Sequence, residues 1–323
     1  MAVLQRGRSR PAGREQMRAR YPDQTGFVER DGVRVFWERY GTGEPAILLM
    51  PTWSVVHSRH WKGQIPFLSR FFRVLTFDGR GNGRSDRPQV AAAYAGTEFA
   101  SDAIAVMGAT GTERVVACGL SMGTGYAARL ALEHPDRVLG IVMFGESIPF
   151  ESASADSGEP EYDASFEEPA ANDAIDWDRH YNVHLWRRDW PGFAQWFAGE
   201  KIFSEPHSTK PIEDSVGWFL ETDAETMIIA EHEPYMRPPA DWEPGPPTPG
   251  RTARWIQQIR CPVRMVHGTD DHITSIGHAR RLAALLGAEL IEVDGGGHST
   301  IGRDPVLANL LIRDFVRRLE HRP

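Results

Sequence analysis

The chain has 323 residues, of which 41% are hydrophobic and 25% charged, and its formal net charge is −8. These values are ordinary for a globular protein, and the length allows one large domain or two smaller ones. The sequence has no apolar run long enough to span a membrane and no signal-peptide pattern near its start, and its two cysteines are too few for a disulfide scaffold. We therefore expect a cytoplasmic protein without membrane contact.

Residues 1–24 form an arginine-rich N-terminal arm. The first 20 positions carry six arginines and a single acidic residue, Glu15. Such an arm could contact an acidic partner or nucleic acid, or it could be a solvated tail. Because the remainder of the chain is acidic, nucleic acid is not expected to be the main ligand. We interpret the arm as a solvated tail.

Apolar runs and helical patterns alternate along most of the chain, beginning near residue 25. Asp31-Gly32 separates the segments 27–30 and 33–38, and Asp-Gly is a strong two-residue turn signal, so these segments are predicted to form a hairpin. The later strands are continuous apolar runs, as expected of strands that are buried on both faces. In chain order we expect strands at 46–50, 73–77, 115–118 and 138–144, with helices at 61–70, 98–108 and 124–134.

The alternation stops near residue 147 and resumes near residue 256. The patterns that follow are a strand at 263–267, a helix at 277–286, a strand at 289–293 and a helix at 305–320. Strands that alternate with helices predict a mostly parallel, twisted sheet with helices on both faces, a fold of the α/β class. We assign 25–146 and 256–323 to this core and 147–255 to an insertion.

The insertion 147–255 has three parts of different composition. Its first part, 146–174, holds nine acidic residues and no lysine or arginine, which is typical of a flexible loop. Residues 176–231 are rich in tryptophan and have helical spacing. Residues 234–249 are rich in proline and are predicted to be a connector.

The tryptophan-rich part of the insertion is predicted to be a lid. Ligands bind at the carboxyl ends of the strands in open parallel sheets, and the insertion falls at that edge. Aromatic side chains line apolar pockets, so Trp186, Trp190 and Trp218 are candidate substrate-binding residues. The alternative is a packed helical decoration that makes no ligand contact.

The segment Gly119-Leu120-Ser121-Met122-Gly123 joins an apolar strand to a helical pattern and has the G-x-S-x-G spacing of a nucleophile elbow. A serine at this apex needs a strained backbone to turn its hydroxyl away from the sheet. Glycines on both sides leave room for that turn. We predict that Ser121 is a nucleophile, and the alternative is an ordinary glycine-rich turn between a strand and a helix.

A serine hydroxyl becomes a good nucleophile only when a base takes its proton and a third group orients that base. The chain order in elbow proteins is serine, acid, histidine. His298 follows the predicted strand at 289–293, and Asp270 and Asp271 follow the strand at 263–267. We predict His298 as the base. The residues themselves leave the acid open between Asp270, Asp271 and Glu146.

With these residues in place, the chain resembles the α/β-hydrolase superfamily over 25–320, apart from the insertion. In that family the acid usually lies three residues after the glycine that closes its strand. Carried onto Gly268, the resemblance implies that Asp271 is the acid and that Asp270 caps the turn. His267 and His272 are then not expected to be catalytic.

The resemblance also implies an oxyanion hole made of two backbone N–H groups. One belongs to Met122, the residue after the nucleophile. The other is expected from Trp53, because Pro51-Thr52 stands where relatives often have His-Gly. The run Asp78 to Ser85, Asp-Gly-Arg-Gly-Asn-Gly-Arg-Ser, resembles the family's turn beside the site and is interpreted as structural.

The sequence therefore predicts an α/β-hydrolase fold with an inserted helical lid, and a serine hydrolase that acts on a carboxylic ester or a related small acyl substrate. Carbon–carbon bond hydrolysis, lactone hydrolysis, perhydrolysis and acyl transfer use the same residues and remain alternatives within the enzyme class. The segments 50–61 and 78–85 also resemble hydrolase-like domains found beside nucleotide cyclases. A non-catalytic or weakly catalytic small-molecule sensor is therefore the alternative from another class. No cofactor and no metal site are expected.

Overall fold

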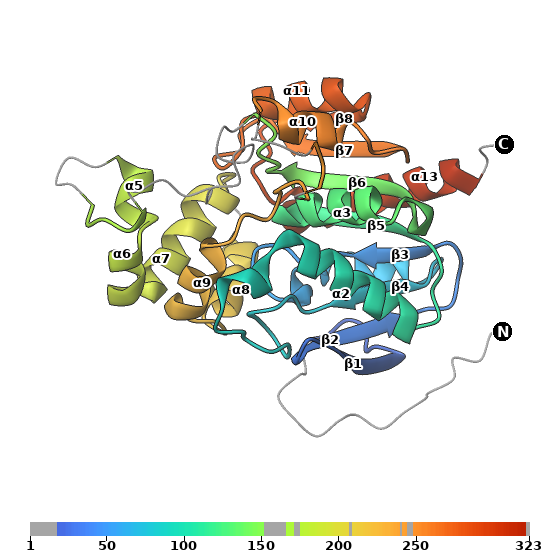
Figure 1. Ribbon diagram of the computed structural model, residues 1–323, viewed down its shortest axis with the longest axis horizontal. Coiled ribbons are helices and arrows are strands. Elements are labelled where there is room, and N and C mark those ends of the chain that lie inside the picture. Colours follow the sequence, from blue (N-terminus) through green and yellow to red (C-terminus); the bar gives the residue numbers. More distant parts are fainter. Residues whose placement is uncertain are drawn as a thin grey trace.

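An eight-stranded sheet runs through the computed structural model and carries helices on both faces (Figure 1). The structure describes residues 18–151, 166–170, 175–206, 209–239, 241–243 and 248–320. Most of the predicted arginine-rich arm and most of the predicted acidic loop therefore lie outside the described residues. The strands are β1 (Gln24–Arg30), β2 (Val33–Tyr40), β3 (Ala46–Leu49), β4 (Val74–Phe77), β5 (Val115–Ser121), β6 (Val138–Glu146), β7 (Val263–Gly268) and β8 (Glu289–Val293).

The sheet is mostly parallel, and its spatial order is β1-β2-β4-β3-β5-β6-β7-β8. β1 pairs with β2 and β2 pairs with β4 in antiparallel fashion, while every later pairing is parallel. Asp31 and Gly32 both have positive φ, 51° and 78°, as a two-residue hairpin turn requires. The predicted fold class and the predicted opening hairpin are confirmed.

Two apolar layers hold the helices against the sheet. Successive side chains of a strand point to opposite faces, so in β3 Ala46 and Leu48 join one core while Ile47 and Leu49 join the other. The first core is covered by α2 (Gly96–Ala109), α3 (Met122–Glu133), α10 (Arg251–Ile256) and α11 (Ile276–Leu286). The second core is covered by α1 (Ile65–Leu68), α12 (Thr300–Arg303) and α13 (Pro305–Glu320).

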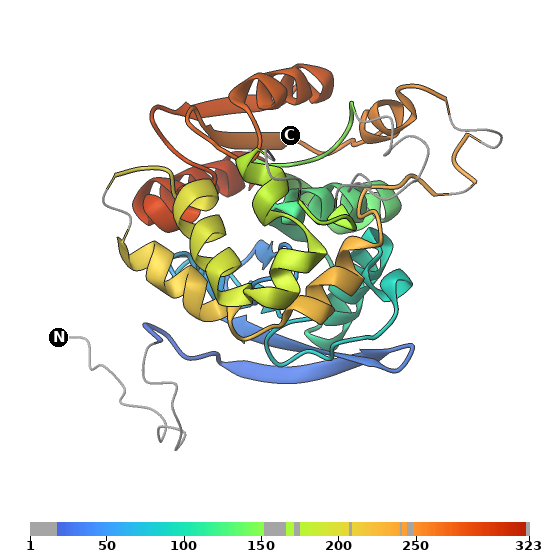
Figure 2. The ribbon, with the colours of Figure 1, turned by 90° about the vertical axis from the view of Figure 1, so that its left-hand side faces the viewer.

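A third apolar cluster lies in the insertion, whose helices stand at the carboxyl ends of the parallel strands (Figure 1; seen from that side in Figure 2). The cluster is largely aromatic, and it includes Trp53 from the loop after β3. The insertion helices are α5 (Asp176–His180), α6 (Val183–Arg188), α7 (Trp190–Trp196), the π-helical turn η5 (Phe197–Ile202), α8 (Thr209–Phe219) and α9 (Ala224–Glu231).

The structure differs from two sequence expectations about element boundaries. Residues 61–70 do not form one helix, because Gly63 and Pro66 interrupt it: a 3₁₀ turn, η1 (Ser58–Trp61), is followed by the four-residue α1. Trp255 lies in the expected insertion but packs with Ile256 into the first core. The structure also describes the 3₁₀ turns η2 (Ala91–Tyr94) and η3 (Pro135–Arg137). Among the helices that the structure describes, none combines the length and the apolar character of a membrane span.

The strand that leads to Ser121 has no room for a side chain at Gly119. A Cβ atom there would lie 2.3 Å from the carbonyl oxygen of Gly123, whereas nothing lies within 4 Å of a Cβ at Gly108 in α2. Gly119→Ala is expected to lower the free energy of unfolding by about 1–3 kcal/mol or more, as overpacking does. Gly108→Ala should change it little or raise it by up to about 1 kcal/mol, because alanine favours a helix. Urea unfolding measures both, and equal effects would contradict the close approach.

Candidate active site

Ser121 sits at a strained junction between β5 and α3. Its backbone has φ 53° and ψ −128°, a conformation that residues other than glycine rarely adopt. The close packing described for Gly119 keeps α3 against β5. On the other side, a Cβ at Gly123 would lie 2.4 Å from the carbonyl oxygen of Pro51. Three chain segments therefore converge on this serine at distances that only glycine permits.

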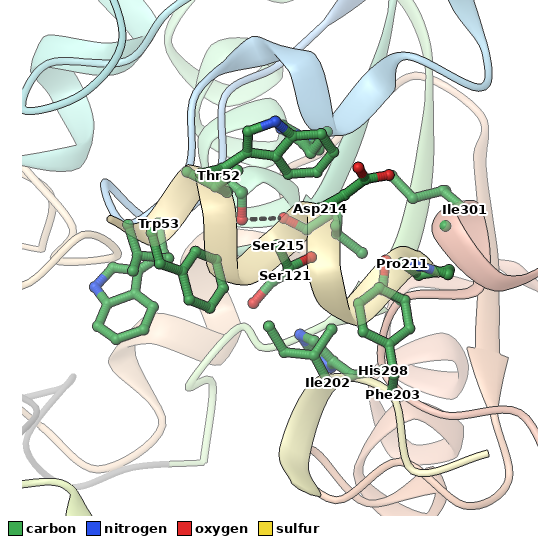
Figure 3. A pocket seen from close by; sticks show the side chains of 18 of the residues that line it. Thr52, Trp53, Ser121, Ile202, Phe203, Pro211, Asp214, Ser215, His298 and Ile301 are labelled. Carbon is green, nitrogen blue, oxygen red and sulfur yellow. Dashed lines mark hydrogen bonds between the residues drawn. The ribbon is translucent and has the colours of Figure 1, made fainter. Parts of the chain in front are cut away.

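His298 and Asp271 lie side by side, and His298 shares a cavity with Ser121 (Figure 3). The histidine comes from the loop between β8 and α12, and the aspartate from the loop after β7. His298 Nδ1 is 2.8 Å from Asp271 Oδ2, and both side chains are almost completely buried. His298 Nε2 is buried and has no hydrogen-bond partner within the described part of the chain. This nitrogen is therefore available to accept a proton.

Asp271 is held in place by four donors. Its Oδ1 accepts hydrogen bonds from the backbone N–H groups of Ile273 at 2.8 Å and Thr274 at 3.0 Å. Its Oδ2 lies 3.1 Å from Nε2 of His267, in addition to the contact with His298. Burial opposes ionisation of this carboxyl, but the two histidines outweigh it and hold the pKa of Asp271 well below its usual range. The aspartate is thus a fixed negative charge behind the His298 ring.

The other two candidate acids lie elsewhere. The Asp270 side chain is about half exposed, and its carboxylate is 3.4 Å from Nε2 of His272. Glu146 pairs with Ser121 in the strand register, but its Oε2 accepts the backbone N–H of Ile148 and lies 3.7 Å from Nε2 of His278. Among the three acids, Asp271 alone has a hydrogen bond to His298 in the described structure.

His267 contacts Asp271, although the sequence did not lead us to expect a role for it in the site. It is fully buried in β7, and its Nε2 lies 2.8 Å from the carbonyl oxygen of Thr274 as well as near Asp271. Both partners accept, so Nε2 carries the proton. Burial disfavours a charged ring, but the hydrogen bond to Asp271 raises the pKa of His267. Its position next to Gly268 at the strand end was the only available sequence signal.

The loop after β3 is tied both to the nucleophile strand and to the insertion. Thr52, which stands where relatives often have glycine, donates its hydroxyl hydrogen bond to the carbonyl of Leu120 at 2.7 Å. The indole of Trp53 is buried in the aromatic cluster, 5.1 Å from the ring of Phe197, and its Nε1 donates to Glu231. The loop is therefore anchored at two consecutive residues.

Met122, which is predicted with Trp53 to donate to an oxyanion, is the first residue of α3. The N–H groups in the first turn of a helix have no acceptor within that helix, so this N–H is available to a ligand next to Ser121. The helix dipole at this end also favours negative charge.

The turn at 78–85 is hydrogen-bonded to the loop after β3. Asp78 accepts from both the backbone and the hydroxyl of Ser58 and from the backbone of Arg84. Asn82 donates to the carbonyl of Ser54 at 2.9 Å. Within this turn the buried Arg80 forms a two-pronged ion pair with Asp102 of α2. These contacts agree with a structural role for the turn.

Two cavities open beside Ser121. The first, which we call cavity A, measures about 240 Å³ and is mostly apolar; Figure 3 shows Ser121 and His298 among the side chains that line it. The second, cavity B, measures about 360 Å³. Four residues line both cavities: Trp53, Ser121, Phe197 and Ile273. A ligand at Ser121 can therefore extend in two directions.

The structure places the three candidate lid tryptophans differently. Trp218 lines cavity A, with its face turned toward Lys62. Trp186 is fully buried and Trp190 is 9% exposed, and neither lines cavity A or cavity B. They pack in the aromatic cluster, and their Nε1 groups donate to backbone carbonyls. Trp186 and Trp190 therefore belong to the apolar core of the insertion, whereas Trp53 and Trp177 line cavity B.

Comparisons with known proteins agree with this architecture. Residues 45–179 match the family model described as alpha/beta hydrolase fold. A 2-hydroxymuconate semialdehyde hydrolase from Pseudomonas sp. (strain CF600) is 28% identical over 279 residues, which cover 83% of this chain and 94% of that protein. A non-heme haloperoxidase from Rhodococcus erythropolis is 36% identical over 121 residues, which cover 37% of this chain and 43% of that protein.

Among solved structures, a thermophilic esterase from Thermogutta terrifontis has the same fold. Its TM-score is 0.70 at 22% identity, and the match covers 92% of this chain and 99% of the esterase.

Within the described ranges, no group of three or more histidine, cysteine, aspartate or glutamate side chains is arranged to hold a metal ion.

Glu146 makes the stability of the fold depend on pH. Burial raises the pKa of Glu146 to about 7. A carboxyl whose pKa is raised by folding contributes stability at low pH and loses that contribution as the pH rises through its folded pKa. Glu146→Gln is therefore expected to be more stable than the wild type at about pH 8.5 and to lose this advantage at about pH 5, as measured by urea unfolding.

Glu151→Gln is the matched control, because Glu151 is exposed and its ion pair with Arg281 lowers the pKa instead. That variant should show no advantage at the higher pH. If Glu146→Gln differed from the wild type by the same amount at both pH values, the pH dependence would not come from Glu146.

Proposed function

Because this chain belongs to the α/β-hydrolase superfamily, we propose that it is a serine hydrolase that cleaves a carboxylic ester or a related small acyl compound. The observation that carries the proposal is a strained serine in one cavity with a buried histidine, whose ring is hydrogen-bonded to an ionised aspartate. A serine at this apex, with a base and an orienting acid, is the arrangement that makes a hydroxyl nucleophilic.

In the proposed reaction, Ser121 attacks the acyl carbonyl carbon while Nε2 of His298 takes the hydroxyl proton. The tetrahedral intermediate collapses, the alcohol leaves with the proton from His298, and an acyl-enzyme remains. Water then attacks the acyl-enzyme with His298 again as the base, which releases the acid and restores the serine. Asp271 holds the His298 ring in the tautomer with the proton on Nδ1 and stabilises its charged form.

The developing oxyanion would be bound by the backbone N–H groups of Trp53 and Met122. Each such donor is worth about 3 kcal/mol in the barrier, so the position of the loop after β3 matters. The Thr52 hydrogen bond to Leu120 and the burial of the Trp53 indole in the lid cluster support a fixed loop. We propose that this side-chain contact compensates for the missing glycine in the loop.

Cavity A supports an apolar or aromatic part in the substrate. Its walls include Val55, Leu120, Phe203 and Ile301 beside the Ser121 hydroxyl. Carbon–carbon bond hydrolysis, lactone hydrolysis, perhydrolysis and acyl transfer pass through the same residues and remain alternatives. Carbon–carbon bond hydrolysis and perhydrolysis are kept as alternatives because the relatives include proteins named as a semialdehyde hydrolase and a haloperoxidase.

The test compares the wild type with Ser121→Ala on p-nitrophenyl acetate and p-nitrophenyl butyrate. The wild type should release p-nitrophenol faster than the variant by several orders of magnitude, with the larger kcat/KM for butyrate because its chain extends into cavity A. If the two proteins released p-nitrophenol at the same rate, the hydrolase proposal would fail. The sensor alternative would then take its place.

A second prediction concerns the acid. Asp271→Asn should lower kcat by about 10⁴-fold, because the amide favours the wrong tautomer of His298. Asp270→Asn removes the neighbouring carboxylate, which points to His272, and should change kcat by less than about threefold. The same p-nitrophenyl butyrate assay measures both variants. Equal losses in the two would contradict the assignment of Asp271.

A further inference from the structure

Cavity B has an unusual combination of walls. It is lined by six aromatic rings and three carboxylates, and its described lining contains no lysine, arginine or histidine. The aromatic residues are Trp53, Phe166, Trp177, Tyr181, Phe197 and Tyr235, and the acidic residues are Asp178, Glu231 and Glu233. The reaction proposed above uses none of these carboxylates.

Glu231 lies at the centre of the aromatic wall. It is the last residue of α9, and its two carboxylate oxygens accept hydrogen bonds from Nε1 of Trp53 and from the hydroxyl of Tyr181, each at 2.5 Å. Burial raises the pKa of Glu231, and these two donors oppose the shift because they stabilise the carboxylate. A positive charge placed in the cavity would stabilise the carboxylate further.

The neighbouring groups keep cavity B negative. Among the residues that the structure describes, Arg237 lies 4.0 Å from Glu233, which is at the limit of an ion pair. An anionic substrate group would lie next to the three carboxylates of the lining, which disfavours it.

Cavity A, by contrast, carries cations at its edge. Lys62 and Lys210 both pair with Asp214 there, and its remaining walls are largely apolar. The two cavities share Ser121 but differ in the chemistry of their walls. One substrate bound at Ser121 would therefore have its two parts in different surroundings. An apolar group in cavity B would bury carboxylates for which the described lining supplies no cation, whereas in cavity A Asp214 has Lys62 and Lys210 as partners.

Aromatic faces combined with carboxylates are the chemistry that recognises ammonium groups. The ring quadrupole attracts a cation within about 6 Å of its centroid, and a nearby carboxylate adds an opposite charge. We propose that cavity B binds a cationic group, a quaternary ammonium or a protonated amine, on a substrate whose apolar part lies in cavity A. This inference rests on the proposed function, because it names the substrate class of the same serine.

The first test measures binding without catalysis. Phenyltrimethylammonium and tert-butylbenzene have the same shape and differ only in charge. Ser121→Ala is titrated with each, and the fluorescence of the lining tryptophans, Trp53 and Trp177, is followed. The cation should bind at least about tenfold more tightly than the neutral compound. Equal affinities would overturn the inference.

Substitutions in the same Ser121→Ala background locate the effect. Glu231→Gln should reduce the preference for the cation to less than about threefold, and Trp177→Leu is a second variant that should also reduce it. The matched control is Glu225→Gln, which removes the same charge from an exposed position of α9 outside both cavities. A preference that persisted in Glu231→Gln and Trp177→Leu, or fell equally in Glu225→Gln, would contradict binding in cavity B.

The second test separates this inference from the proposed function. Butyrylcholine and 3,3-dimethylbutyl butyrate are a cationic ester and its neutral isostere, and kcat/KM is measured for both. A preference of about tenfold or more for the cation supports the inference. Hydrolysis of both esters at equal rates would overturn it and leave the hydrolase proposal intact. If neither ester nor p-nitrophenyl butyrate reacted, the hydrolase proposal would fail, and the binding measurement alone would decide the cation site.

Discussion

The strained backbone at Ser121 is the constraint on which the rest of the site depends. A positive φ at a residue other than glycine persists only where the surroundings enforce it. Here β5, α3 and the loop after β3 approach one another so closely that Gly119 and Gly123 cannot carry a side chain. That approach places Ser121 in the lining of both cavities, with Met122 directly after it as the first residue of α3.

The helices of the insertion pack directly against the loop after β3. Trp53 follows Thr52 in the loop after β3, yet its indole belongs to the aromatic core of the insertion. The hydroxyl of Thr52 donates to Leu120 of β5, and the indole N–H of Trp53 donates to Glu231 of α9. The position of the Trp53 N–H therefore depends on the packing of the insertion helices, which also build one wall of cavity B. The proposed acyl chemistry and the proposed substrate selection would therefore both depend on Trp53.

The strained turn at Ser121 and the mostly parallel sheet could be predicted from sequence, because both follow from the patterns of strands, turns and helices. The roles of the serine, the acid and the histidine stay predictions. The choice of Asp271 over Asp270 needed the family resemblance, since two adjacent carboxylates look alike in sequence. His267 escaped prediction because its contact with Asp271 crosses from a strand to the following loop. The lid tryptophans show the same limit: spacing placed Trp186 and Trp218 alike on helices, and only tertiary packing buried one and turned the other toward cavity A.

The central claim is that His298 and Asp271 activate Ser121. Reaction with a fluorophosphonate, followed by peptide mass mapping, tests it most directly, because the reagent bonds covalently to an activated serine. We expect a single adduct on the peptide that contains Ser121 in the wild type and none in His298→Ala. An unmodified Ser121 in the wild type, or the same adduct in His298→Ala, would contradict it.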